Sequence, residues 1–239
     1  MEALLLAWYD AHGRALPWHG TRDPYAILVS EVMAQQTQID RVTPRYVEWL
    51  ERWPTAEALA AASPADVIRA WQGLGYNRRA LALHRAAQHI AAYGWPLDLT
   101  VLPGVGPYTA AAVRCFALGE DVLPRDVNIK RVERRTGYAF TGAAAQALMD
   151  LGATICLARI PRCERCPLAA RCPSVGTRDE PLRKQSRFEG SFRQRRSVVL
   201  RAVAERVQRT SDLDADVLAS LQQDGLVVVA VDGTARLPA

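Results

Sequence analysis

Four of the five cysteines lie close together near residue 160, and their spacing is typical of metal ligands. The pattern is C-x6-C-x2-C-x5-C, formed by Cys156, Cys163, Cys166 and Cys172. Soft sulfur ligands select an iron–sulfur cluster or zinc, and spacing alone does not separate the two. Disulfides are disfavoured because nothing else in the sequence is typical of a secreted protein. Cys115 lies in an apolar helical pattern and is interpreted as a core thiol.

A glycine-rich segment at residues 102–110 has the form of a helix-hairpin-helix turn. Gly104 and Gly106 permit a tight turn without Cβ clashes. The next helix then presents backbone N–H groups at its start, and these bind a phosphate without regard to base sequence. Taken alone, the segment is equally compatible with an ordinary turn.

Two carboxyl groups have contrasting surroundings. Glu31 lies within the apolar run 27–33, and a carboxyl group in apolar surroundings has a raised pKa and can stay protonated as a general acid. Asp126 precedes the expected helix 127–135, where it is also a good N-cap. One protonated and one ionised carboxyl group is the usual arrangement for cleaving a glycosidic bond. An exposed or helix-capping glutamate and a purely structural aspartate are the alternatives.

The segments around these residues resemble the MutY-type adenine DNA glycosylases of the helix-hairpin-helix, endonuclease III superfamily. The resemblance covers about residues 1–175 and extends to the cysteine spacing. Its motifs are Leu16-Pro17-Trp18, Asp23-Pro24-Tyr25, Ser30-Glu31-Val32-Met33-Ala34-Gln35-Gln36-Thr37, Gly73-Leu74-Gly75-Tyr76 and Met149-Asp150-Leu151-Gly152-Ala153. The tail segments 188–194 and 221–227 resemble the short tail of actinobacterial members.

The resemblance implies catalytic roles for four residues. Glu31 would protonate the adenine ring, and Asp126, grouped with Asn128, would stabilise positive charge on the sugar. Tyr108 stands where bifunctional relatives carry a Schiff-base lysine, which implies base removal without strand cleavage. A core or phosphate-contacting tyrosine is the alternative at position 108. Of the two lysines, Lys130 is expected to contact phosphate or solvent.

The resemblance also implies binding roles. Gln36 and Tyr76 would fill the gap left by a flipped base, although Tyr76 is equally compatible with a packed aromatic residue. The adenine pocket would be lined by Arg14, Trp18 and Asp150, with a core anchor as the alternative for Trp18. The residues implied in phosphate binding are Gly104, Gly106 and Thr109, and a [4Fe–4S] cluster would be held by Cys156, Cys163, Cys166 and Cys172.

Three departures from the family pattern are evident. The interval from Asp126 to Met149 is shorter than the family's by roughly two helices. Ala34 replaces a large apolar residue of the glutamine motif. The tail is too short for the usual domain that reads 8-oxoguanine, so how the opposite base is recognised is left open.

The pattern of apolar residues indicates the elements that position these groups. Spacings of three and four predict helices within 27–50, 56–72, 79–93 and 108–118. After a linker at 173–187, we expect helices at about 193–208 and 212–224, then a strand at 226–231 that turns at Asp232-Gly233.

The expected fold is therefore an all-α, two-lobed helix-hairpin-helix glycosylase fold with an iron–sulfur loop and a small winged-helix-like α+β module. The expected domains are a helical barrel with the hairpin (20–120), a cluster domain (1–19 and 121–176) and the C-terminal module (186–239).

Charge and composition favour a DNA partner. The 239 residues carry a net charge of +5, and residues 178–209 alone carry +6 from ten basic and four acidic side chains. No run approaches the length of a membrane span, and no signal peptide is evident.

We expect a cytoplasmic, nucleoid-associated monomer that acts on double-stranded DNA containing a mismatch and removes adenine opposite 8-oxoguanine or guanine. The alternatives are a thymine or uracil mismatch glycosylase on the same scaffold and a catalytically inactive DNA-binding or regulatory protein.

Overall fold

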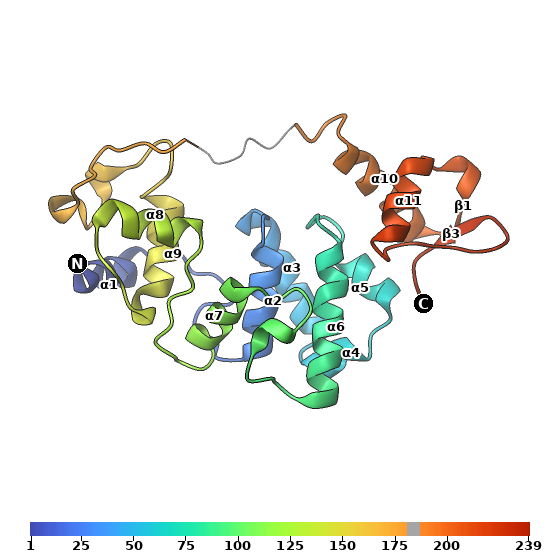
Figure 1. The fold of residues 1–239 in the computed structure, drawn as a ribbon, viewed down its shortest axis with the longest axis horizontal. Coiled ribbons are helices and arrows are strands. Elements are labelled where there is room, and N and C mark those ends of the chain that lie inside the picture. The colour runs from blue at the N-terminus through green and yellow to red at the C-terminus, as the bar shows by residue number, and fades with distance from the viewer. Residues whose placement is uncertain (181–186) are drawn as a thin grey trace. The chain divides into compact units, whose positions relative to one another are not determined.

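Two units make up the chain, and each is built from segments distant in sequence. The computed structural model describes residues 1–180 and 187–239, so Lys184 and the centre of the expected linker lie outside the described residues. The first unit is Met1–Leu28 with Gly106–Lys184, and the second is Val29–Val105 with Gln185–Ala239. Helix α2 (Pro24–Ala34) crosses the boundary between the two units. Figure 1 labels the α-helices of both units.

The first unit is a helical core around α8 and α9. Its helices are α1 (Glu2–His12), α7 (Pro107–Phe116), α8 (Val127–Thr136) and α9 (Ala145–Thr154). Helix α9 packs against both α8 and α1 (Figure 1). Buried residues of this core include Leu5, Ile129, Val132, Leu148 and Leu151. Short 3-10 turns at Gly142–Ala144, Cys163–Arg165 and Ala169–Arg171 complete the unit.

The helices of the second unit follow the sequence pattern, with one break inside 27–50 and another inside 56–72. They are α3 (Ile39–Arg52), α4 (Ala56–Ala60), α5 (Pro64–Ala70) and α6 (Arg78–Tyr93), followed by a 3-10 turn at Leu99–Val101. Thr55 and Ser63 cap α4 and α5 through their side chains. The helical pattern over 27–50 is not continuous, because α2 ends at Ala34 and α3 begins at Ile39.

The C-terminal residues form two helices and a small antiparallel sheet. The elements are α10 (Phe192–Glu205), β1 (Gln208–Arg209), a 3-10 turn (Thr210–Asp212), α11 (Ala215–Gln223), β2 (Val228–Val229) and β3 (Thr234–Arg236). The strand order is β1-β3-β2, with Val228 opposite Arg236 and Gln208 opposite Ala235. The expected hairpin is therefore present. The helix predicted at about 193–208 is shorter at its C-terminal end, because α10 ends at Glu205 and β1 begins at Gln208.

The C-terminal elements share a core with the helices of the second unit. Ile68 of α5 and Leu81 of α6 lie in one cluster with Leu200, Val203 and Leu221. Burying a large aliphatic side chain contributes roughly 1.5–3 kcal/mol. Deleting the tail would therefore expose Ile68 and Leu81 as well as remove charge, so charge substitutions test its contribution to DNA binding more cleanly than truncation does.

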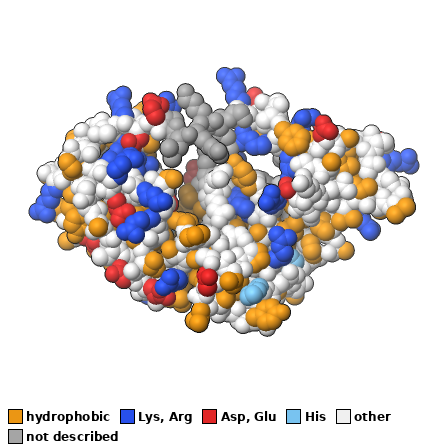
Figure 2. All heavy atoms as spheres, viewed as in Figure 1, with side chains coloured by type: hydrophobic (Ala, Val, Ile, Leu, Met, Phe, Trp, Pro, Cys, Tyr) orange, Lys and Arg blue, Asp and Glu red, His pale blue; other side chains and the backbone are white. Residues whose placement is uncertain are grey.

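The surface carries charges of both signs. In the view of Figure 2, Lys and Arg side chains are spread among Asp and Glu side chains rather than gathered in one patch.

Among the helices that the structure describes, none combines the length and hydropathy required to cross a bilayer.

Candidate functional site

The Asp126 carboxylate is held through both oxygens at the start of α8. Oδ1 accepts the Ile129 backbone N–H at 2.7 Å, which makes Asp126 the N-cap of the helix, as its position predicts. Oδ2 accepts from Asn128 Nδ2 at 2.9 Å. The side chain is only half-buried. The direction of this carboxylate is therefore set by the helix that it caps.

Asn128 is in turn held by Arg131, a residue that sequence reasoning missed. Arg131 Nη2 donates to Asn128 Oδ1 at 2.8 Å and to the Gly152 carbonyl at 2.7 Å, and its Nε donates to the Cys156 carbonyl at 2.7 Å. A carboxylate only accepts and a guanidinium only donates, so these two partners fix the orientation of the Asn128 amide. A hydrogen-bonded path thus runs from Asp126 to the backbone of the cysteine loop.

Gly152 allows this close packing of α9 against α8. A Cβ at Gly152 would lie 2.7 Å from the Cβ of Asn128, so a larger residue would displace Asn128. The signal that would have identified Arg131 is its three-residue spacing from Asn128 on one helix, which places the two on the same face.

Glu31 has an unusual place on α2. Glu31 is half-buried, whereas all the remaining residues from Tyr25 to Met33 are buried, with at most 4% of their surface exposed. The apolar run around Glu31 in the sequence is therefore a buried stretch of α2. The side chain is nevertheless accessible enough to meet a ligand.

Gln36 and Tyr76 lie in turns at the end of α2 and before α6. Both are exposed, Tyr76 by 44%, so Tyr76 is not a packed core aromatic. Within the described chain they are the non-glycine residues with positive φ, at 55° and 46° respectively. Both turns are held by Arg79, which sequence reasoning also missed.

Arg14 and Asp150 are brought together in the first unit. The Asp150 carboxylate is 1% exposed and accepts three hydrogen bonds from Arg14, at 2.7 Å from the backbone N–H and at 3.0 and 2.6 Å from the guanidinium. Because Arg14 engages both oxygens, Asp150 acts chiefly on Arg14. Trp18 is half-buried, with its ring edge-on to His19, and is not a fully buried core anchor.

His19, which follows Trp18, makes two hydrogen bonds to other side chains of the first unit. Nδ1 pairs with the Tyr9 hydroxyl at 3.2 Å and Nε2 with Gln146 Nε2 at 2.7 Å. Burial lowers the pKa of His19, so the imidazole is neutral at neutral pH. Burial together with the nearby Asp150 charge raises the pKa of Tyr9 to about 12, which keeps its hydroxyl protonated.

The hairpin turn needs its glycines for different reasons. Gly104 has φ +80°, and a Cβ there would lie 2.8 Å from the Cβ of Ala82. Gly106 is the N-cap of α7 and offers no side-chain cap to the helix start. The Thr109 side chain is 2% exposed, so its contribution to phosphate binding would come from the backbone. Tyr108 is half-buried at the same helix start, and Lys130 on α8 is exposed.

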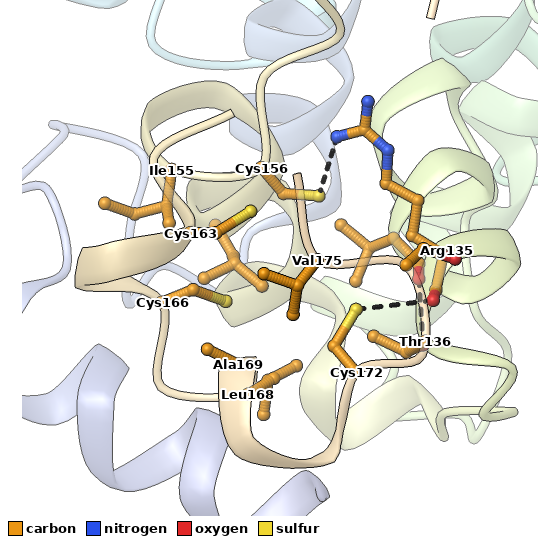
Figure 3. A pocket seen from close by; sticks show the side chains of 13 residues that line it. Arg135, Thr136, Ile155, Cys156, Cys163, Cys166, Leu168, Ala169, Cys172 and Val175 are labelled. Carbon is orange, nitrogen blue, oxygen red and sulfur yellow. Dashed lines mark hydrogen bonds between the residues drawn. The ribbon is translucent and has the colours of Figure 1, made fainter. Parts of the chain in front are cut away.

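The four clustered cysteines line one pocket (Figure 3). None of the five cysteines forms a disulfide. The remaining walls are largely apolar and include Val132, Leu151, Ile155, Leu168 and Val175. The described residues contain no group of three His, Cys, Asp or Glu side chains arranged to hold a single metal ion.

Several polar groups contact the cysteine sulfurs. Arg135 Nη1 lies 3.4 Å from Cys156 Sγ, and the Gly176 backbone N–H donates to Cys163 Sγ at 3.3 Å. The Cys172 thiol donates to the Arg135 carbonyl at 3.3 Å. Burial raises the pKa of Cys166, and the other three sulfurs contribute in the same direction. The first two contacts are suited to stabilise thiolates.

Comparison with protein families and curated relatives gives a consistent result. Residues 29–151 match the family described as HhH-GPD superfamily base excision DNA repair protein. Adenine DNA glycosylase from Mycolicibacterium smegmatis is 40% identical, and the alignment covers 96% of this chain and 93% of that protein. The human adenine DNA glycosylase is 35% identical over 70% of this chain and 38% of its own length.

Solved structures agree on the fold. A thermostable thymine-DNA glycosylase superposes with a TM-score of 0.65 and 27% identity, covering 72% of this chain and 94% of that one. A trapped endonuclease III–DNA covalent intermediate gives 0.61 at 21% identity, covering 72% and 93%. With curated relatives that match almost from end to end, the chain belongs to the HhH-GPD superfamily of base excision DNA repair proteins and, within it, to the MutY-type adenine DNA glycosylases.

Proposed function

We propose that this chain is a monofunctional DNA glycosylase that removes adenine mispaired with 8-oxoguanine or guanine. The observation that carries the proposal is the Asp126 carboxylate, aimed by Ile129 and Asn128 at the start of α8. A fixed negative charge of this kind stabilises the positive charge that develops on a deoxyribose as its glycosidic bond breaks. Its position in a chain with adenine glycosylase relatives indicates which bond is cleaved.

The reaction assigns opposite protonation states to two carboxyl groups. Glu31 gives its proton to a ring nitrogen of the adenine, and the bonding electron pair leaves with the base. Asp126 stays ionised beside the resulting sugar cation until water adds to the anomeric carbon and loses a proton. The half-buried place of Glu31 on an otherwise buried stretch of α2 suits the acid role, because apolar surroundings favour the neutral form.

Binding roles follow the same pattern. Gln36 and Tyr76 fill the space vacated by the flipped adenine. Arg14 and Trp18 contact the extruded base, and Asp150 fixes the Arg14 guanidinium. The hairpin binds a DNA phosphate through backbone N–H groups at the start of α7, the region of Gly104, Gly106 and Thr109. The substrate is double-stranded DNA carrying the mismatch, bound by a monomer at the nucleoid.

A thymine or uracil mismatch glycosylase is the second candidate, favoured by the structural match to a thymine-DNA glycosylase. That match has 27% identity, against 40% and 41% for curated adenine glycosylases over most of both chains. We therefore assign adenine. A catalytically inactive DNA-binding protein is disfavoured, because both carboxyl groups are present and the Asp126 carboxylate is held by two hydrogen bonds.

A panel of mismatched duplexes tests the proposed function. Wild-type protein should release adenine from A:8-oxoguanine and A:G pairs, and strand breaks should appear only after alkali, because position 108 is tyrosine rather than lysine. Release of thymine from T:G without adenine release would transfer the assignment to the second candidate. Rapid strand cleavage through an adduct that borohydride traps would contradict the monofunctional proposal. Lys130 would then be the candidate for the amine that forms the Schiff base.

The cysteine pocket fits a [4Fe–4S] cluster. Four cysteines line its wall, and the Arg135 guanidinium and the Gly176 N–H approach two of the sulfurs, as hydrogen-bond donors do around cluster thiolates. We propose that Cys156, Cys163, Cys166 and Cys172 hold this cluster. When bound, it would crosslink the loop at four points and so stabilise the support beneath Arg131.

Iron content tests the cluster. Anaerobically purified protein should contain about four irons per chain and absorb broadly near ~400 nm. Cys163→Ser should lower the iron content and the soluble yield, because metal-held loops fold with their ligands. Cys115→Ser is the matched control, since Cys115 lies outside the pocket and its thiol meets the Gly142 carbonyl at 3.4 Å. One zinc per chain in a colourless sample would overturn the cluster proposal.

The proposed domain organisation follows from these sites. We propose a helical barrel domain at 20–120, a cluster domain formed by 1–19 and 121–176, and a winged-helix-like module at 186–239. The helix–strand–helix–hairpin order and the β1-β3-β2 sheet order support the last of these. Its basic residues would add phosphate contacts to the complex.

A further inference from the structure

The two turns that carry Gln36 and Tyr76 have a strained backbone. A positive φ in a residue with a side chain costs free energy, because Cβ approaches the neighbouring carbonyl oxygen. Such conformations persist where the surrounding structure holds them, and they concentrate at functional sites. Both turns would otherwise relax, so contacts from the surrounding structure must hold them.

One guanidinium contacts the end of α2. Arg79 is the second residue of α6, and its Nη1 donates to the carbonyl oxygens of Val32, Met33 and Gln35 at 2.7, 3.2 and 2.5 Å. The last carbonyl groups of a helix lack intrahelical partners and attract positive charge. Arg79 therefore caps α2. It also holds the backbone of Gln35, the residue immediately before Gln36.

The same guanidinium contacts the Tyr76 turn. Nη2 donates to the carbonyl oxygens of Leu74 and Gly75 at 3.4 and 3.0 Å, and Nε donates to that of Tyr76 at 3.4 Å. The guanidinium carbon lies 5.5 Å from the centre of the Tyr76 ring, within the range of a cation–π contact. Arg79 thus holds the backbone from Leu74 to Tyr76, and the direction of the Tyr76 side chain depends on that backbone.

Thr37 links the two turns at the same point. Its hydroxyl lies 3.0 Å from Arg79 Nη2, 3.2 Å from the Leu74 carbonyl and 3.3 Å from the Gln35 carbonyl. Burial lowers the pKa of Arg79 to about 10, so the guanidinium remains charged at neutral pH. A planar fork of five N–H donors can serve both turns at once, which an ammonium group cannot.

We propose that Arg79 is a positioning residue that fixes Gln36 and Tyr76 in a single arrangement, so that the two side chains enter the base stack as one unit. This inference rests on the proposed role of Gln36 and Tyr76 in filling the gap left by the flipped adenine. A wedge assembled before DNA binding avoids the ordering of two separate loops during base flipping. Without Arg79, the side chains of Gln36 and Tyr76 would still be present, but their turns would no longer be held in one arrangement.

The test is a mutational cycle read by single-turnover adenine release from an A:8-oxoguanine duplex. Arg79→Lys keeps the charge and should slow release about tenfold, because a small misplacement of a positioning group has a large effect on rate. Affinity for a duplex that already contains the abasic product should change less than about twofold, since no base remains to be flipped. Arg78→Met is the matched control, because exposed Arg78 contacts Asp224 instead and should leave the rate unchanged.

The cycle separates positioning from a general structural role. In a Gln36→Ala/Tyr76→Ala background, Arg79→Lys should cause no further loss, because its effect acts through those two residues. An equal loss in that background would overturn the inference. Wild-type rates for both Gln36→Ala and Tyr76→Ala would instead overturn the wedge assignment itself. If Arg79→Lys folds poorly, Thr37→Val removes the bridging hydroxyl alone and should show the same dependence on Gln36 and Tyr76.

Discussion

Glu31→Gln is expected to slow adenine release by ~100-fold or more while DNA binding is nearly unchanged. Glutamine keeps the size of the side chain on α2 but cannot deliver a proton to the departing base. Without that proton, the base must leave as an anion, and the barrier rises in the transition state rather than in the bound complex. The measurement is single-turnover release from an A:8-oxoguanine duplex, with affinity for the same duplex measured separately.

The separate measurement of rate and affinity distinguishes an acid from a merely structural glutamate. An acid acts on the rate of release, whereas a structural glutamate would affect folding and DNA binding as well. Glu51→Gln is the matched control, because Glu51 is an exposed glutamate on α3 of the same unit. Release at the wild-type rate from Glu31→Gln would show that another group supplies the proton.

The features that sequence reasoning predicted are local ones. The cap at Asp126 depends on a side chain and an N–H group within three residues, so sequence position alone defines it. The cysteine pocket is similar, because 17 residues contain all four thiols. The hairpin of β2 and β3 followed from Asp232-Gly233 and the apolar run before it.

The features that were missed depend on distant residues. Arg79 and Arg131 act on carbonyl oxygens far away in sequence, such as that of Val32 for Arg79 and that of Cys156 for Arg131. No periodicity encodes such contacts, and an arginine on a helix is usually a surface residue. Strand β1 was missed because only its pairing with β3 defines it.

The break between α2 and α3 shows the same limit. Apolar residues continue at helical spacing through 27–50, and the residues between Ala34 and Ile39 include neither glycine nor proline. What ends α2 is the positive φ of Gln36 and the capping of its last carbonyl groups by Arg79. A tertiary contact therefore overrides a local preference at a turn that we assign to function.

Asp126→Asn is expected to lower adenine release by ~100-fold or more, because it removes the negative charge that faces the sugar cation. Asparagine is as good an N-cap as aspartate, so α8 should still begin at residue 127 and the melting temperature should change little. One local conflict arises. In one of its two orientations the new amide places its NH₂ group opposite Asn128 Nδ2, and two donors cannot pair.

Asp126→Ser resolves that conflict and completes the test. Serine caps a helix well, carries no charge and is too short to oppose Asn128, so a loss of rate as large as that of the asparagine variant would identify charge as the cause. Asn128→Ala should have a smaller effect, because it leaves the carboxylate in place and removes the Asn128 hydrogen bond while the Ile129 N–H still holds Oδ1. Both Asp126 variants could instead release adenine within about threefold of the wild-type rate, a difference below ~1 kcal/mol in the barrier. That result would show that Asp126 serves only as the helix cap that its position in the sequence predicts.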